Sequence, residues 1–174
     1  MARVPAGSDF DGWVRLLGIA HARQHAKRHL LAAGPAALPA LRRGLGDRNP
    51  VVRQFCVALL DHLVDEDAIP DLIAALDDED PVVCARALHA LACDACKQNE
   101  CRPGDDAFVP RAFELLRDHP DTTVRAAAIN ALGQVGRRRP DVAAALAIAG
   151  DGEPDSGLRR MAQRRVQRLI RYGG

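Results

Sequence analysis

Apolar residues recur along most of the chain at the three- and four-residue spacing of amphipathic helices. Segments such as "NPVVRQFCVALLDHL" at 49–63 and "DTTVRAAAINALGQV" at 121–135 each carry one apolar face. Ala, Leu and Val supply most of the apolar side chains, and aromatic residues make up only 3% of the chain. Small and aliphatic residues suit closely packed helices better than β-sandwiches. The pattern therefore predicts an all-α protein.

The helices recur as pairs. An aliphatic residue followed by proline stands at Leu38-Pro39, Ile69-Pro70 and Val109-Pro110, and a looser copy begins at Pro140. Each is followed by an amphipathic stretch, a turn that is mostly acidic and a second amphipathic helix. A helical pair of thirty-odd residues cannot bury its apolar face alone, so neighbouring pairs must stack.

The second helices align on a shared register. Their anchor positions are Arg23, Arg53, Cys84, Arg125 and Arg159, with intervals of 30, 31, 41 and 34 residues. The residue before each anchor is apolar. The residue three positions after it is small in all five copies: Ala26, Cys56, Ala87, Ala128 and Ala162. The residue seven positions after it is aliphatic: Leu30, Leu60, Leu91, Leu132 and Val166. These offsets share one helical face, where a small residue permits close helix approach.

On these residues the chain resembles the HEAT-repeat family, in particular the short bacterial HEAT-like repeats of the PBS-lyase type. The resemblance implies a right-handed α-solenoid of about five HEAT-like helical hairpins, forming a single domain over residues 1–174. The approximate repeats are 9–34, 35–65, 66–105, 106–138 and 139–174. The second helices are expected to line the concave side. The resemblance also implies a ladder of turn acids and second-helix arginines, for which Asp47 and Arg53 fit. Asp78 faces an anchor occupied by Cys84, and the equivalent acid drifts to Glu153 and Leu17.

The interval of 41 contains roughly ten extra residues, which place a cysteine-rich insertion at 93–105 in the third repeat. Cys93 and Cys96 have the spacing of a zinc knuckle, Cys101 follows, and His89 lies one helical turn before Cys93. The segment has almost no apolar side chains, so a metal could supply its order. We therefore expect a structural zinc site at His89, Cys93, Cys96 and Cys101. Free thiols, a disulfide, a redox pair and an iron–sulfur cluster are the alternatives.

Two other features have simpler interpretations. Cys56 occupies the small core position and is interpreted as an inert buried thiol. His21, His25 and His29 recur every fourth residue and could bind a transition metal, but a solvated basic helix face is the favoured interpretation.

Charge is unevenly distributed although the net charge is only +1. Residues 1–60 carry a net +6, residues 61–106 a net −10 and residues 107–174 a net +5. Nine arginines lie near the C-terminus, within 136–140 and 159–171, and they keep nucleic-acid binding or DNA repair as an alternative function. The acidic middle would interrupt a continuous phosphate track, which disfavours that alternative.

The sequence favours a non-enzymatic protein-binding scaffold or adaptor. It contains no phosphate loop, nucleophile elbow or zinc-protease motif. The candidate binding residues on the second helices are Arg53, Arg86, Arg125 and Arg159. A thiol-based redox or metal sensor is a second alternative. No apolar run approaches the length of a membrane span, and the first residues lack the apolar centre of a signal peptide, so a cytoplasmic location is expected.

Overall fold

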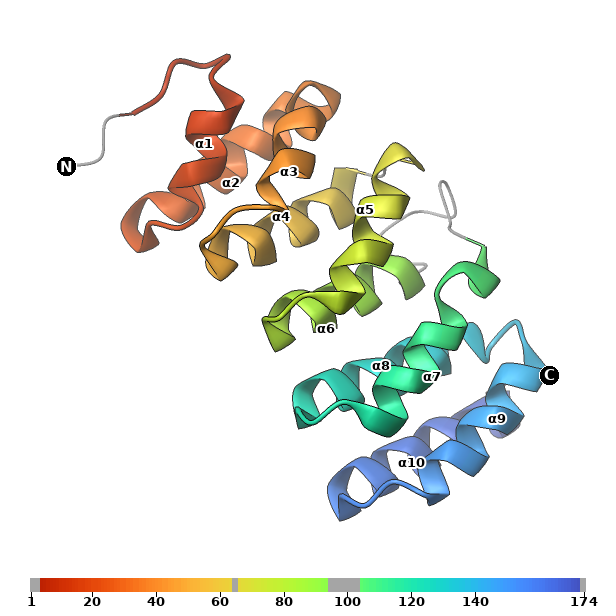
Figure 1. The fold of residues 1–174 in the computed structure, drawn as a ribbon. Helices are drawn as coiled ribbons and strands as arrows, with labels where there is room; N and C mark the ends of the chain where they lie inside the picture. Colours follow the sequence, from red (N-terminus) through yellow and green to blue (C-terminus); the bar gives the residue numbers. More distant parts are fainter. Residues whose placement is uncertain (1–3, 64–65, 94–103, 173–174) are drawn as a thin grey trace.

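A computed structural model describes residues 4–63, 66–93 and 104–172. Within these ranges the regular elements are helices (Figure 1). The α-helices are α1 (Phe10–Leu16), α2 (Ala20–Ala33), α3 (Leu38–Gly44), α4 (Pro50–Leu63), α5 (Ile69–Ala74), α6 (Pro81–Ala92), α7 (Val109–Asp118), α8 (Thr122–Val135), α9 (Pro140–Asp151) and α10 (Ser156–Tyr172). Short 3₁₀ helices are η1 (Gly34–Ala37), η2 (Glu66–Ala68), η3 (Ala75–Asp77) and η5 (Asp105–Ala107).

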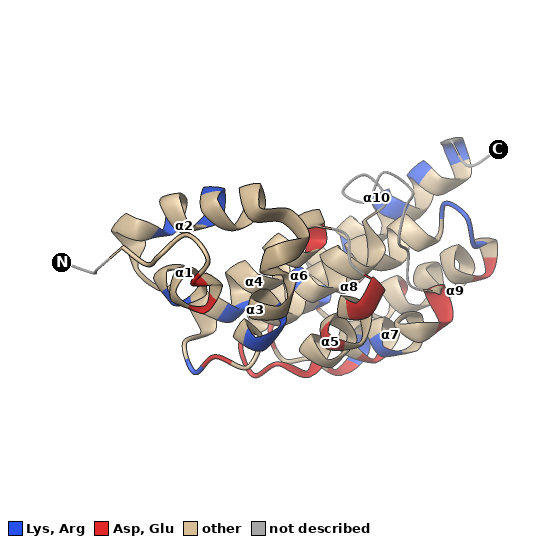
Figure 2. Ribbon diagram, turned by 90° about the horizontal axis from the view of Figure 1, so that it is seen from above, with Lys and Arg blue, Asp and Glu red and all other residues tan. Residues whose placement is uncertain are grey.

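The helices form antiparallel pairs that stack side by side from one end of the molecule to the other (Figure 1). The pairs are α1 with α2, α3 with α4, α5 with α6, α7 with α8, and α9 with α10. Seen from above, α2, α4, α6, α8 and α10 form the inner row of a curved stack, and the first helices form its outer row (Figure 2). The expected all-α, right-handed solenoid is confirmed, and its second helices lie on the concave side.

Local sequence explains where these helices begin. The aliphatic-proline doublets stand at the first two positions of α3, α5 and α7, where proline is tolerated because the helix does not use its N–H. The turns before the second helices supply the N-caps. Asp80 accepts from the Val83 N–H at 3.0 Å, and Asp121 accepts from the Thr123 N–H at 2.7 Å. The starts of these helices are therefore encoded by short-range signals.

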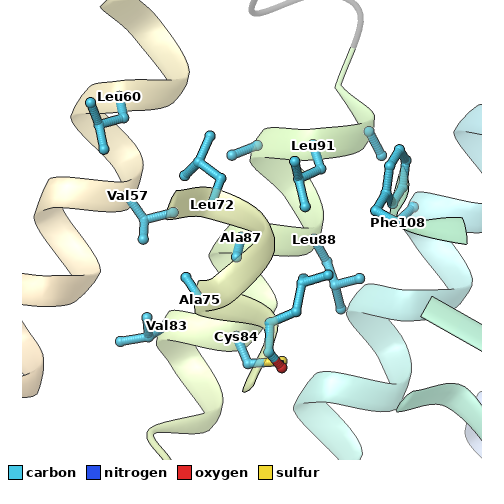
Figure 3. Close-up of a cluster of buried hydrophobic side chains, with 14 of the residues drawn as sticks. Val57, Leu60, Leu72, Ala75, Val83, Cys84, Ala87, Leu88, Leu91 and Phe108 are labelled. Carbon is cyan, nitrogen blue, oxygen red and sulfur yellow. The ribbon is translucent and has the colours of Figure 1, made fainter. Parts of the chain in front are cut away.

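The small residues of the second helices occupy matching buried sites. Ala26, Cys56, Ala87 and Ala128 are fully buried, and Ala162 is 1% exposed. Around Ala87, side chains of α4, α6, the α5–η3 segment and Phe108 pack together (Figure 3). Two glycines of the first helices allow these helices to approach the small residues of the second helices closely. A Cβ on Gly44 would lie 2.5 Å from the Cys56 Sγ, and one on Gly150 would lie 2.5 Å from the Ala162 Cβ.

Ion pairs between neighbouring repeats account for the uneven charge along the sequence. In the outer row, Arg43 of α3 pairs with Asp11 of α1, and Arg42 pairs with Asp71 of α5. Further along, Arg111 of α7 pairs with Asp77 of η3. Arg138 and Arg139, which precede α9, pair with Asp105 and Asp106 of η5. The acidic middle of the chain thus faces arginines from the basic segments on either side.

In the chain, the cysteine-rich insertion follows α6, which ends at Ala92, and precedes η5, which begins at Asp105. Cys93 follows α6 directly and is buried. The rest of the insertion, 94–103, lies outside the described residues. Among the described helices, none combines the length and apolarity needed to cross a membrane.

Enlarging a residue of the small register should destabilise the stack. We expect Ala87→Leu to lower the free energy of unfolding by about 1–3 kcal/mol, because no space for the larger side chain exists at this fully buried site. Ala74→Leu on the exposed side of α5 is the matched control and should change it by less than about 0.5 kcal/mol. Urea denaturation of both variants measures the difference. Equal effects would contradict the role of the small register.

Candidate binding surface

The anchor arginines first tie each second helix to its own repeat. Each one donates to the backbone carbonyl six residues before it, at 2.7–2.9 Å. The donor and acceptor pairs are Arg23 with Leu17, Arg53 with Asp47, Arg125 with His119, and Arg159 with Glu153. These bonds satisfy carbonyls where the first helix ends and its turn begins. The arginines are thus part of the hairpin itself.

Two anchor arginines also bind the turn of the following repeat. Arg53 makes two hydrogen bonds of 2.8 Å with the Asp78 carboxylate, and Arg125 lies 3.2 Å from the Glu153 carboxylate. The bond to Asp78 raises the pKa of Arg53 above its ordinary value. The sequence had matched Asp47 with Arg53, but Asp47 contributes only its carbonyl oxygen to Arg53, and its carboxylate accepts from the Asn49 N–H. The ladder therefore runs between repeats.

The ladder is interrupted at the third repeat. There the anchor is Cys84, whose thiol donates to the Leu76 carbonyl at 3.2 Å, a contact within its own repeat. In the next repeat, the position equivalent to Asp78 is occupied by His119, which is not an acid. Burial raises the pKa of the Cys84 thiol to about 11 and that of Cys56 to about 12. Both thiols are buried and protonated at neutral pH, in agreement with the interpretation of Cys56 as inert.

The candidate binding arginines therefore differ in their placement. Arg53, Arg125 and Arg159 direct hydrogen bonds into the solenoid, and the Arg53 side chain is only 8% exposed. Arg86 lies on the inner row instead, with its guanidinium carbon 5.2 Å from the centre of the Phe55 ring. Binding by these four residues stays a prediction, and Arg86 is the one that the structure places beside grooves of the inner face.

Phe55 is the centre of a cationic cluster on the inner face. The charged ends of Arg23 and Lys27, from α2, lie 5.0 and 5.4 Å from its ring centre, and Arg86 approaches from α6. Such distances permit cation–π attraction. This Phe55 cluster joins three consecutive second helices through one aromatic side chain. It presents positive charge next to an apolar ring, a surface suited to acidic and aromatic groups.

A first groove lies between α4 and α6. It has a volume of about 340 Å³ and is lined by Ala58, Asp61, His62, Val82, Ala85, Arg86 and His89. Asp61 is only 4% exposed, and in the described part of the chain its Oδ1 has no hydrogen-bond partner. Its Oδ2 lies 3.6 Å from the His89 Nε2. The groove thus combines small apolar walls with a buried carboxylate.

A second groove continues from α6 to α8 and α10. Its volume is about 330 Å³, and its lining includes Cys93, Asn130, Gln134 and Arg165. Ala85 and His89 line both grooves, so the two adjoin at α6. Arg165 of α10 donates to the Asn130 side chain, and burial, followed by the nearby Arg168 and Arg137, lowers its pKa from the ordinary value. The grooves and the Phe55 cluster together involve all five second helices.

The predicted zinc ligands are only partly covered by the structure. His89 and Cys93 both line the second groove, at the C-terminal end of α6. Cys96 and Cys101 lie outside the described residues. Within residues 4–63, 66–93 and 104–172, no group of three His, Cys, Asp or Glu side chains could hold a metal ion. A zinc site that uses His89 and Cys93 would need at least one further ligand from residues 94–103. The zinc site therefore stays a prediction.

The histidine row of α2 agrees only in part with the solvated face that was favoured for it. His21 and His25 are exposed, whereas His29 is half-buried and stacks on the buried Trp13 with ring centres 4.1 Å apart. His25 meets the same Trp13 ring edge-on at 5.0 Å. The His29 Nε2 also lies 2.8 Å from the Gly7 carbonyl oxygen. These two histidines attach the segment before α1 and α1 itself to α2. The packing partner, Trp13, lies on another helix and could not be assigned from the spacing of the histidines.

The sequence interpretation missed Phe55 and Asp61. Asp61 stands eight positions after the anchor, where the first, third and fourth repeats have Leu31, Ala92 and Gly133. The fifth repeat has Gln167 there, so the column shows a carboxylate at a position where the other repeats have no charged residue. Its burial follows from the packing of α4 against α6 and was not visible in the sequence.

Comparisons with known proteins agree with this architecture. The profile of a family described as HEAT repeats matches residues 20–92 and 92–166. The chain is also similar to the crystal structure of an engineered protein solved by a structural genomics consortium. The sequence identity is 22%, the TM-score is 0.54, and the alignment covers 95% of this chain and 80% of the other. At that identity the likeness concerns the fold alone. No curated protein matches the chain.

Breaking the pair between Arg53 and Asp78 should destabilise the fold. We expect Arg53→Met or Asp78→Ala alone to lower the free energy of unfolding by about 1–3 kcal/mol, because each removes the buried charge-assisted hydrogen bonds of this pair. In Asp78→Ala, Arg53 keeps the Asp47 carbonyl and Glu79 as partners, which limits the loss. The double variant should lose less than the sum of the two. Chemical denaturation of the four proteins in this cycle gives the coupling. Arg117→Met removes the exposed pair with Asp118 and is the control, with no measurable change expected.

Proposed function

Because this chain belongs to the HEAT-repeat family, we propose that it is a non-enzymatic scaffold that binds a protein partner along the inner face of its solenoid. A stack of helical pairs offers an extended curved surface and a rigid frame, which suits binding of a large ligand. Family membership alone does not identify the binding face. The contacts of the inner row support that choice.

One observation carries the proposal. The Phe55 cluster, the first groove and the second groove follow one another along the inner row of second helices. All five second helices contribute side chains to this series, whereas the outer row pairs its charges between neighbouring repeats. The inner face therefore combines hollows, an aromatic ring and charged groups over the length of the stack, as protein interfaces do.

The alternative is nucleic-acid binding through α10. Arg160, Arg164 and Arg168 are exposed on that helix. Against it, Arg42, Arg53 and other arginines of the flanking segments form ion pairs with the acidic middle of the chain. The exposed arginines of α10 lie at one end of the solenoid, where they would contact only a short length of a phosphate backbone.

The insertion is proposed to bind zinc through His89, Cys93, Cys96 and Cys101. Support comes from the thiolate and imidazole types of these residues, their spacing and the placement of His89 and Cys93 on one groove. The metal would hold the insertion against the inner face and thereby shape the second groove. A redox or metal sensor using the same thiols would differ in one respect, because oxidation or chelation would then change partner binding as well as stability.

Peptide selection tests the scaffold. A displayed random peptide library panned on the full chain should yield binders whose affinity falls at least about tenfold when Phe55→Ala and Arg86→Glu are combined, because the Phe55 cluster is removed. Arg117→Glu, on the exposed part of α7, is the control and should leave binding unchanged. Affinity is measured by isothermal titration. Peptides that bind the double variant equally well, or a salt-sensitive shift of labelled DNA without peptide binding, would contradict the proposal.

Metal analysis tests the zinc site. Protein purified without added metal should contain about one zinc per chain by mass spectrometry, and Cys96→Ser should lose it. Cys84→Ser is the control, since Cys84 is buried in the core and bonded to the Leu76 carbonyl, and it should keep the metal. A wild-type protein without bound zinc and with five reactive thiols after unfolding would remove the site.

A further inference from the structure

We propose that the first groove is a pocket for one cationic side chain, arginine or lysine, of the protein partner, and that Asp61 is the carboxylate that receives it. The inference rests on the proposed function, because the occupant is part of a bound protein. It adds the chemistry of one contact, which neither the family nor the similar structure specifies.

The Asp61 carboxylate lacks the partners that a buried charge normally has. Its residue is 4% exposed, and within the described residues Oδ1 accepts no hydrogen bond. Oδ2 lies 3.6 Å from the His89 Nε2, which is beyond hydrogen-bond distance. Leaving a carboxylate buried without hydrogen bonds is unfavourable for folding, so such groups are expected to serve binding or catalysis.

The fold does not require a carboxylate at this position. The equivalent residues are Leu31, Ala92 and Gly133 in the first, third and fourth repeats. Ala92 and Gly133 are buried at the contact between neighbouring second helices. A small side chain satisfies the packing there. Asp61 is therefore a departure from the repeat, at an interface where a groove opens beside it.

The groove fits a long cationic side chain. Ala58, Val82 and Ala85 provide apolar walls for the methylene groups, and Asp61 provides the negative charge. Arg86 shares the groove, but its guanidinium lies over the Phe55 ring, and within the described part of the chain no ion pair joins it to Asp61. A guanidinium or ammonium group entering the groove would pair with the Asp61 carboxylate and so give this buried charge a cationic partner.

An arginine derivative tests the pocket directly. Nuclear magnetic resonance of the full chain is recorded while N-acetyl-arginine N-methylamide is added, and the neutral citrulline derivative of the same shape is the control. We expect the arginine probe to shift the amide signals of Ala58, Ala85 and His89 in a saturable way. Asp61→Asn should weaken this binding at least about tenfold, and the citrulline probe should cause no such shift.

Thermal stability separates a binding role from a structural one. Asp61→Ala introduces the residue that the third repeat has at this position. Because it removes an unsatisfied buried charge, we expect the Tm to rise by about 2–4 °C while binding of the arginine probe is lost. A fall in Tm would mean that the carboxylate stabilises the fold, and the pocket would then be rejected.

The outcomes also distinguish this inference from the proposed function. If selected peptides bind the inner face but neither they nor the arginine probe depend on Asp61, the scaffold stands and the pocket is wrong. If the arginine probe binds at Asp61 but no peptide binds the inner face, the proposed function falls, and so does the identification of the occupant as a partner side chain. Arginine or lysine at a fixed place in the selected peptides, lost in selections on Asp61→Asn, would support both.

Discussion

Close packing of the helices around one small residue of each second helix is the constraint on which the rest of the structure depends. The first helix of a repeat can approach its second helix closely at Cys56 and Ala162 because both sides of the contact are small, and the small residues are buried in all five repeats. This packing holds each hairpin in its place in the stack. It also brings the turn of one repeat within reach of an anchor arginine in the repeat before it, as in Arg53 with Asp78.

Ion pairs between repeats add to this packing and determine which repeats lie next to each other. Apolar faces that repeat along a chain could associate in more than one register, whereas Arg42 with Asp71 and Arg111 with Asp77 join particular neighbours. The buried ladder adds a stronger constraint at Arg53 and Arg125. At Cys84 the ladder has no arginine, so the third and fourth repeats depend more on apolar packing between α6 and α8, next to the insertion.

The inner face carries the residues that stacking does not explain. Phe55, Asp61 and Arg86 occupy the middle of the solenoid, at columns where other repeats have different residue types. A repeat protein can change such residues with little effect on its frame, because each hairpin packs mainly on its neighbours. Asp61 is the clearest case, because it places an unsatisfied carboxylate at a column where other repeats have buried small residues. Packing does not explain this residue, whereas binding of a cationic group does.

The sequence by itself determined the class of fold, the number of hairpins and the small register, because helix periodicity recurs in every repeat and proline doublets and capping side chains mark the helix starts in most of them. It also located the insertion after α6, from the interval between Cys84 and Arg125. Only the tertiary structure decided that Arg53 bonds Asp78, that His29 stacks on Trp13 and that Asp61 is buried beside a groove. These contacts join residues of different helices, and their distances depend on how far each repeat is rotated and shifted against the next, which no local pattern specifies.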